Sequence, residues 1–189
     1  MKLWLLRHAR VTVEAGICYG VSDLPADPID TQQAAQRFAD LPATGSRVCV
    51  SPSSRTLALA TALQALRPDL QAPQVDPRLH EMNFGEWERQ PWSSIPRQAL
   101  DAWTADFAHH RFGGQESTQE VIDRVAQALE DTRAHAASDT IWVTHAGVIR
   151  AVHYLQAHGH GTIQSARDWP MDAPAMGDWV CVEPCVGAA

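Results

Sequence analysis

The sequence lacks any long apolar run. Near its N-terminus only the four residues Leu3–Leu6 stand between Lys2 and Arg7, whereas a membrane-spanning helix needs about 20 apolar residues. A signal peptide needs an apolar core of about 7 to 15 residues. The segment therefore fits neither, and we expect a soluble, cytoplasmic protein with no membrane partner.

Cysteine is scarce, and no two cysteines form a C-x-x-C pair. The four residues are Cys18, Cys49, Cys181 and Cys185. This spacing indicates neither a disulfide framework nor a zinc site, so we expect reduced thiols. The histidines around positions 109–110 and 153–160 lack partner acids or thiols at ligand spacing. We interpret them as solvated loop residues and expect no metal site.

Positive charge is in deficit. Lys and Arg number 15 against 22 Asp and Glu, which gives a formal net charge of -7. Proteins that bind nucleic acids or membrane surfaces carry an excess of cations on one face, so both classes are disfavoured. A small anionic substrate remains compatible if positive charge gathers locally. The 189 residues contain no repeat or low-complexity tract, which predicts a single domain over residues 1–189. The sequence leaves a homodimer open.

Short apolar runs alternate with helical patterns along the chain. Runs that predict buried strands occur at Leu3–Leu6, Val48–Val50 and Ile141–Thr144, with an extended piece near 75–79 and a final edge strand at Trp179–Val182. This alternation predicts an α/β fold of three layers, with a mostly parallel central sheet and helices on both faces.

The helix signals are of two kinds, caps and periodic apolar residues. Asp30 with Gln33 predicts a helix start, and Ser117 with Glu120 forms the pattern of a capping box. Leu59 and Leu63 mark a helix directly after the second strand. Tryptophan and phenylalanine at helical spacing predict a helical, cap-like insertion over about 90–115.

Charged and titratable residues follow the predicted parallel strands. Arg7 and His8 follow the first strand, Arg55 lies in the first turn of the helix after the second, and His145 ends a later one. Because the carboxyl ends of parallel strands share one edge of the sheet, we expect these groups to converge. Another loop after an extended segment supplies Glu81. Arginine and histidine together suit a phosphate dianion.

These motifs carry a family resemblance. Arg7-His8, Ser51-Pro52-x-x-Arg55, the Glu81 loop and Thr144–Gly147 occur in the order typical of the histidine phosphatase superfamily, also called phosphoglycerate mutase-like. The chain resembles that family from Lys2 to about Leu155. The resemblance implies a phosphoric monoester hydrolase with a phosphoglycerate mutase-like fold.

The resemblance also implies a role for each matching residue. His8 is the expected nucleophile, which forms a phosphohistidine. Arg7, Arg55 and His145 are expected to bind the phosphoryl group, and Glu81 to serve as general acid and then as general base. No metal or other cofactor is expected, since the arginines offset the phosphate charge.

Three stretches narrow the resemblance to one branch. Gly16–Pro25, Leu79–Glu88 and Gly114–Ser117 resemble the α-ribazole phosphatases of cobalamin biosynthesis, which remove the 5′-phosphate of α-ribazole phosphate. The chain departs from the family pattern at Ala9-Arg10-Val11 and at Gln115. The expected contacts to this small phosphorylated metabolite come from Arg10, Tyr19, Gly20 and Ala146.

Three alternatives stay open at the level of the sequence. The first is a broad-specificity phosphatase of sugars or nucleotides. The second is a phosphoglycerate mutase-like enzyme, which the shortness of the chain disfavours. The third is a non-catalytic module that binds phosphorylated ligands, which would have no need of an acid at Glu81.

Overall fold

The computed structural model describes residues 1–135 and 137–183, so Cys185 and the end of the predicted 1–189 domain lie outside the described residues. One sheet runs through the described part. Its strands are β1 (Leu3–Arg7), β2 (Arg47–Val50), β3 (Gln74–Val75), β4 (Thr140–Thr144) and β5 (Trp179–Val182). Their spatial order is β3-β2-β4-β1-β5, with β5 antiparallel to β1 and the other neighbours parallel.

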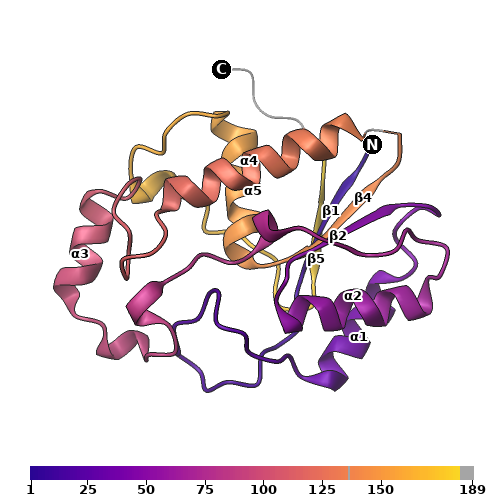
Figure 1. Ribbon diagram of the computed structural model, residues 1–189, viewed down its shortest axis with the longest axis horizontal. Helices are drawn as coiled ribbons and strands as arrows, with labels where there is room; N and C mark the ends of the chain where they lie inside the picture. The colour runs from indigo at the N-terminus through magenta and orange to yellow at the C-terminus, as the bar shows by residue number, and fades with distance from the viewer. Residues whose placement is uncertain (136, 184–189) are drawn as a thin grey trace.

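Helices cover both faces of this sheet, as the alternating pattern predicts (Figure 1). The α-helices are α1 (Pro28–Phe38), α2 (Ser54–Leu66), α3 (Arg97–Ala105), α4 (Thr118–Ala134) and α5 (Ala146–His158). Short 3-10 turns are η1 (Pro77–Leu79), η2 (Gly85–Trp87), η3 (Trp92–Ser94) and η4 (Ala166–Asp168). Helices α1 and α2 pack on one face, α4 and α5 pack on the other, and α3 stands to one side of the sheet.

Strand β1 shows why the sheet is buried between two helical layers. Successive strand side chains point to opposite faces, so Leu3 and Leu5 pack in the core beneath α4 and α5, while Trp4 and Leu6 pack beneath α1 and α2. All four are buried. A strand apolar on both faces is stable only in such a three-layer arrangement, which confirms the predicted fold class.

Two local predictions were wrong. Helix α1 begins at Pro28, because the carboxylate of Asp27 accepts the backbone N–H groups of Ile29 and Asp30 and a proline suits the first helical position. The expected start at Asp30 lies inside the helix. In the segment expected to be extended near 75–79, only Val75 belongs to a strand, as the last residue of the two-residue β3, and η1 follows after Asp76.

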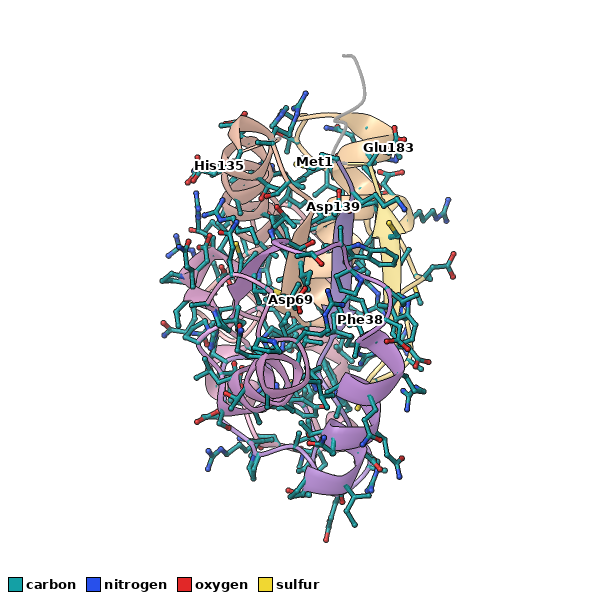
Figure 2. The ribbon with its side chains drawn as sticks, turned by 90° about the vertical axis from the view of Figure 1, so that its right-hand side faces the viewer. Met1, Phe38, Asp69, His135, Asp139 and Glu183 are labelled. Carbon is teal, nitrogen blue, oxygen red and sulfur yellow. The ribbon has the colours of Figure 1, made fainter. Side chains whose placement is uncertain are left out.

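The predicted capping box is confirmed, and the amino ends of two strands lie together. The capping box of α4 is present, since Ser117 and Glu120 each accept the other's backbone N–H. Figure 2 shows Met1 near Asp139, and the backbone N–H of Lys2 donates to the Asp139 carboxylate at 2.7 Å. The amino ends of β1 and β4 therefore lie side by side, and their carboxyl ends emerge together at the opposite edge.

The described residues include three of the four cysteines. Cys18 and Cys49 are buried, Cys181 is exposed, and all three are free thiols. Within residues 1–135 and 137–183, no helix combines the length and the apolar character that crossing a bilayer requires.

Candidate active site

The carboxyl edge of the sheet brings the predicted strand-end residues together. Arg7 is the last residue of β1 and lies beside Thr144, the last residue of β4. His8 and His145 follow these two residues, and their rings lie 5.2 Å apart between centroids. Arg55, in the first turn of α2, follows the neighbouring strand β2. Parallel strand pairing thus brings residues that are distant in the sequence into one cluster.

His8 is held in a form suited to nucleophilic attack. Its Nδ1 lies 2.7 Å from the carbonyl oxygen of Ala9, and because a carbonyl only accepts, Nδ1 carries the hydrogen. Nε2 therefore keeps its lone pair. The pKa of His8 is lowered from 6.5 to about 3, chiefly by burial and also by the charges of Arg55 and Arg7, while the hydrogen bond to Ala9 opposes the shift. The imidazole is neutral at neutral pH.

His145 is completely buried beside His8. Burial, followed by the neighbouring His8 and Arg55, lowers the pKa of His145 well below its usual value. Its Nε2 lies 2.8 Å from Ser51 Oγ, and among the described residues its buried Nδ1 has no hydrogen-bond partner. When Ser51 donates to Nε2, Nδ1 carries a hydrogen that is available to an anion oxygen.

Two arginines supply positive charge at this edge. Arg55 is fully buried, donates to the carbonyls of Ser22 at 2.9 Å and Gly20 at 2.6 Å, and lies over the Tyr19 ring. Arg7 donates to the Pro174 carbonyl at 2.9 Å. The Nε of each arginine is buried without a partner in the part of the chain that the structure describes. Both guanidinium groups are thus positioned by backbone carbonyls and retain donors for a phosphate.

Glu81 lies in the loop between η1 and η2. One carboxylate oxygen accepts the N–H of Gly147 at the start of α5, and the other accepts the N–H of Met82, each at 3.1 Å. A Cβ at position 147 would lie 2.2 Å from Glu81 Oε1, so only glycine permits this approach. The helix N-terminus therefore holds the carboxylate at the edge of the site.

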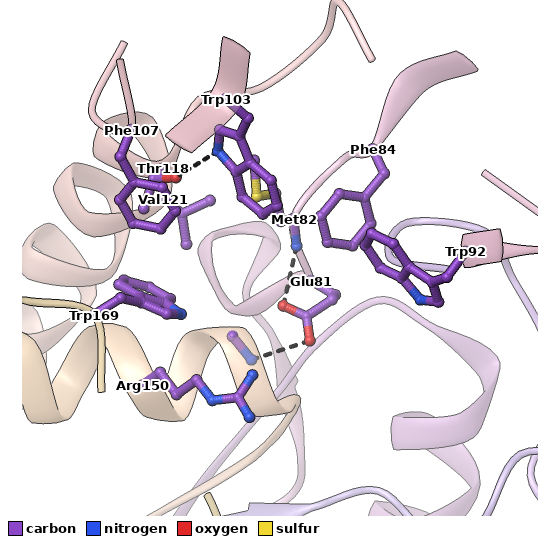
Figure 3. A pocket seen from close by; sticks show the side chains of 11 residues that line it. Glu81, Met82, Phe84, Trp92, Trp103, Phe107, Thr118, Val121, Arg150 and Trp169 are labelled. Atoms are coloured by element: carbon purple, nitrogen blue, oxygen red, sulfur yellow. Dashed lines mark hydrogen bonds between the residues drawn. The ribbon is translucent and has the colours of Figure 1, made fainter. Parts of the chain in front are cut away.

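Glu81 also borders a cavity of about 190 Å³ (Figure 3). Its walls are mainly aromatic and apolar, with Thr118 and Arg150 as polar members. The aromatic members are Phe84, Trp92, Trp103, Phe107 and Trp169. In Figure 3 the Arg150 guanidinium lies between Trp169 and Glu81. A phosphate ester bound beside Glu81 can place an apolar alcohol portion in this cavity.

The structure places the expected substrate-contact residues differently from the five central ones. Arg10 is 61% exposed and pairs with Asp27 and Asp30, which raises its pKa, chiefly through the hydrogen bond to Asp30. These carboxylates offset the charge that we expected Arg10 to bring to the pocket, so its contacts give that role no support.

Tyr19 and Gly20 act on Arg55, through the aromatic ring and the backbone carbonyl. Gly20 also has no room for a side chain, because a Cβ there would lie 1.8 Å from the Met82 carbonyl. Ala146 is the buried first residue of α5. We keep substrate contact by these three residues as a hypothesis.

Sequence reasoning missed several polar residues of the site. Ser51 contacts His145, and the His80 ring lies 6.0 Å from the His145 ring, with its Nε2 3.2 Å from Ser53 Oγ. Burial lowers the pKa of His80, and Arg55 lowers it further. The position of Ser51 directly after a strand was a usable signal, whereas nothing local distinguishes His80.

Glu88 was also missed, although it organises the site. Its carboxylate accepts the backbone N–H groups of Gly20, Val21, Ser22 and Phe84 at 3.0 to 3.2 Å. Since Arg55 donates to carbonyls of the same Gly20–Ser22 loop, Glu88 fixes the segment that positions Arg55. It also ties that loop to the segment that carries Glu81.

The buried neutral histidine predicts an acid-sensitive fold. Between pH 6.5 and about 3 the unfolded chain protonates His8 while the folded chain does not, so the free energy of unfolding falls as pH falls. The expected contribution is about 1.4 kcal/mol per pH unit. We expect the free energy of unfolding of His8→Asn, measured by urea denaturation, to depend less steeply on pH between pH 6 and pH 4. The difference in slope corresponds to about one proton. Parallel curves for the two proteins would contradict the neutral state of His8.

Comparisons with known proteins agree with this geometry. Residues 3–175 match the family model described as "Histidine phosphatase superfamily (branch 1)". The chain is 31% identical over 160 residues to "Putative phosphoserine phosphatase 2" of Hydrogenobacter thermophilus, covering 80% of this chain and 76% of the relative.

Solved structures show the same fold. A mycobacterial glucosyl-3-phosphoglycerate phosphatase superposes with a TM-score of 0.78 at 20% identity, covering 96% of this chain and 92% of the other. A phosphoglycerate mutase from Thermus thermophilus superposes with a TM-score of 0.68 at 26% identity, covering 97% of this chain and 93% of the other. The five-stranded, mostly parallel sheet with its flanking helices is therefore of the phosphoglycerate mutase-like type.

Proposed function

The chain belongs to branch 1 of the histidine phosphatase superfamily, and on that basis we propose that it is a phosphomonoesterase that works through a phosphohistidine at His8. The neutral, buried His8 with a free Nε2 supports the role of nucleophile. Arg7 and Arg55, whose charges act on His8, and His145, whose ring lies beside it, offer donors that suit the phosphoryl oxygens.

The first step transfers the phosphoryl group to the enzyme. Nε2 of His8 attacks phosphorus, the ester P–O bond breaks, and protonated Glu81 gives its proton to the leaving alcohol oxygen. As the bond breaks, charge on the phosphoryl oxygens is offset by the two guanidinium groups. The products are the free alcohol, a phosphohistidine and the Glu81 carboxylate.

The second step restores the enzyme. The Glu81 carboxylate takes a proton from water, the water oxygen attacks phosphorus, and the N–P bond breaks. Inorganic phosphate leaves, His8 is again neutral, and Glu81 is again protonated. A single carboxyl group serves both steps because the alcohol leaves the position that water then enters.

For the substrate we propose α-ribazole 5′-phosphate, and the observation that carries this proposal is the aromatic cavity beside Glu81. The alcohol portion of that ester bears a flat, apolar benzimidazole ring, which aromatic walls can stack against. Stacking of a base on an aromatic side chain contributes about 1 to 3 kcal/mol. Small, strongly charged alcohols such as serine would lose solvation in such a cavity.

A second candidate is an amino-acid or sugar-acid phosphate, because Arg150 lies in the cavity wall. A guanidinium there can pair with a substrate carboxylate. The relative of Hydrogenobacter thermophilus carries a phosphoserine phosphatase name, which fits this alternative.

A substrate panel separates the two candidates. We expect kcat/KM for α-ribazole 5′-phosphate to exceed that for phosphoserine and 3-phosphoglycerate by at least about 100-fold, as the stacking and desolvation differences predict. Replacing Trp103 with leucine should lower kcat/KM for α-ribazole 5′-phosphate at least about tenfold and leave phosphoserine hydrolysis within about threefold. Initial rates of phosphate release measure both.

The matched control is Trp87→Leu. Trp87 contacts the same Phe112 ring as Trp103 but does not line the cavity. An equal loss of kcat/KM for α-ribazole 5′-phosphate in both variants would mean that the substitutions disturb packing and that Trp103 does not stack on the substrate ring. Faster hydrolysis of phosphoserine than of α-ribazole 5′-phosphate would assign the enzyme to the second candidate class.

A further inference from the structure

The loop that carries Glu81 has little regular structure of its own. Residues 81–84 lie between η1 and η2, outside every helix and strand of the described chain. A general acid must hold its proton within hydrogen-bond reach of the leaving oxygen, and a displacement of 1 Å can cost about 100-fold in rate. Contacts from outside the loop must therefore fix the position of Glu81.

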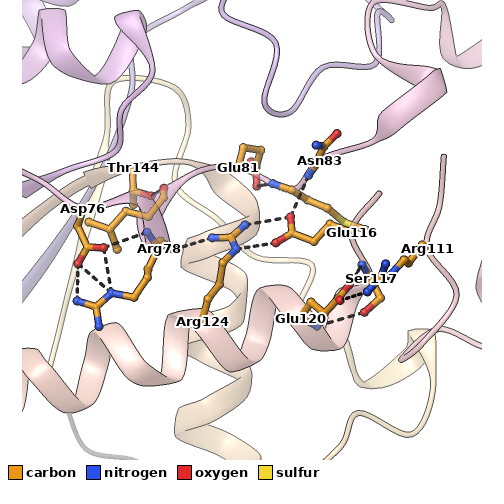
Figure 4. A network of polar contacts seen from close by, with 12 residues as sticks. Asp76, Arg78, Glu81, Asn83, Arg111, Glu116, Ser117, Glu120, Arg124 and Thr144 are labelled. Carbon is orange, nitrogen blue, oxygen red and sulfur yellow. Dashed lines mark hydrogen bonds and ion pairs between the residues drawn. The ribbon is translucent and has the colours of Figure 1, made fainter. Parts of the chain in front are cut away.

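A bidentate ion pair lies against this loop (Figure 4). Arg124 of α4 donates to Glu116 from Nε at 2.7 Å and from Nη2 at 3.3 Å. Both side chains are about four-fifths buried, at 18% and 20% exposure. Such a planar, partly buried pair is rigid and directional.

The outer atoms of this pair bind the main chain on both sides of Glu81. Nη1 of Arg124 donates to the Arg78 carbonyl at 2.6 Å. Oε2 of Glu116 accepts the N–H of Asn83 at 3.0 Å. The pair therefore spans the segment from three residues before Glu81 to two residues after it.

We propose that the Arg124–Glu116 pair positions Glu81 for proton transfer to the leaving alcohol. The hydrogen bonds that these two side chains make in the described structure run to each other and to the backbone of Arg78 and Asn83, not to His8, Arg7 or Arg55. Both are positioning residues. A misplaced Glu81 would slow both steps, but only the first step, in which Glu81 protonates the alcohol, depends on which alcohol leaves. This inference rests on the proposed function, since it assigns a device to the acid of that reaction.

Leaving-group dependence distinguishes such a role from general destabilisation. Phenyl phosphate and 4-nitrophenyl phosphate both present a flat ring to the cavity. Phenolate is a poor leaving group that needs the proton, whereas 4-nitrophenolate is stable as an anion. Because kcat/KM reports only the steps up to release of the alcohol, it isolates proton donation by Glu81. We expect Arg124→Met to lower kcat/KM for phenyl phosphate by about 30-fold and for 4-nitrophenyl phosphate by no more than about threefold.

Two further variants keep the test decisive if Arg124→Met folds poorly. Glu116→Gln retains an oxygen that can accept from Asn83 but loses the charge. We therefore expect a smaller loss of activity than in Arg124→Met, again larger for phenyl phosphate than for 4-nitrophenyl phosphate. Combining Arg124→Met with Glu81→Gln should cost no more than Glu81→Gln alone, because a misplaced acid and an absent acid fail at one step. Arg133→Met, an exposed change in the last turn of the same helix, is the control.

The outcomes separate failure of this inference from failure of the proposed function. Equal losses on both esters, or additive losses in the double variant, would overturn the positioning role while leaving the phosphatase intact. If Glu81→Gln itself lacked selectivity between the esters, or if the wild-type protein hydrolysed neither, the proposed function would fail first, and the positioning role with it.

Discussion

Replacing His8 with asparagine is expected to lower kcat for every phosphate ester by at least about a thousandfold, because the nucleophile of the covalent step is removed. The asparagine amide is small enough for the buried position and can still donate to the Ala9 carbonyl that His8 contacts. The fold should therefore survive at neutral pH. Steady-state phosphate release measures the loss.

Trapping the covalent intermediate tests the same residue directly. The wild-type enzyme mixed with labelled ester and quenched in alkali, where phosphohistidine is stable, should carry label at His8. The His8→Asn protein should carry none, and His109→Asn, an exposed change, should label normally. Hydrolysis by the His8→Asn protein within tenfold of wild type would refute the mechanism. Tight phosphate binding without turnover of any ester in the wild type would favour the non-catalytic binding module.

Arg55→Met is expected to have the second largest effect. Arg55 is fully buried, and its Nε has no partner among the residues that the structure describes. The variant loses a charge-assisted donor to the phosphoryl oxygens and leaves the Gly20 and Ser22 carbonyls without their donor. We expect kcat/KM to fall by at least about a thousandfold, since both binding and transition-state stabilisation are lost.

Binding of orthovanadate, an analogue of the transferred phosphoryl group, separates these effects from turnover. Calorimetry should show affinity weakened by at least about 100-fold in Arg55→Met. The control Arg97→Met removes an arginine that is 87% exposed and pairs with Asp101 of its own helix, so the affinity of this variant for orthovanadate should stay within about twofold of wild type. A loss below tenfold in Arg55→Met would show that Arg55 does not hold the phosphate.

Much of the fold could be predicted because buried strands and capped helices have local signatures. Leu3–Leu6 and Ile141–Thr144 are apolar on both faces, and only a sheet covered by two helical layers accommodates such strands. The start of α1 could not be read in the same way, since Asp27 and Asp30 are both capable caps. Both carboxylates pair with Arg10, but only Asp27 accepts backbone N–H groups of the first turn.

The aromatic cavity and the Arg124–Glu116 pair could not be predicted from local sequence patterns. Trp103 and Phe107 were recognised as a helical insertion, but Trp169 comes from a different part of the chain and completes the same cavity. Arg124 looks like any polar residue of an amphipathic helix. Only the packing of α4 beside η1 places it against the Arg78 carbonyl.

The convergence of Arg7, His8, Arg55 and His145 could be predicted from local patterns, because parallel strands bring their carboxyl ends to one edge of the sheet. Which side chains line the cavity beside Glu81 depends on tertiary packing. Arg10, two residues beyond His8, turns to Asp27 and Asp30, while Arg150, from α5, lines the cavity. The physical reason is that strand pairing follows from local apolar pattern, whereas a side chain's partners depend on which distant segments pack around it.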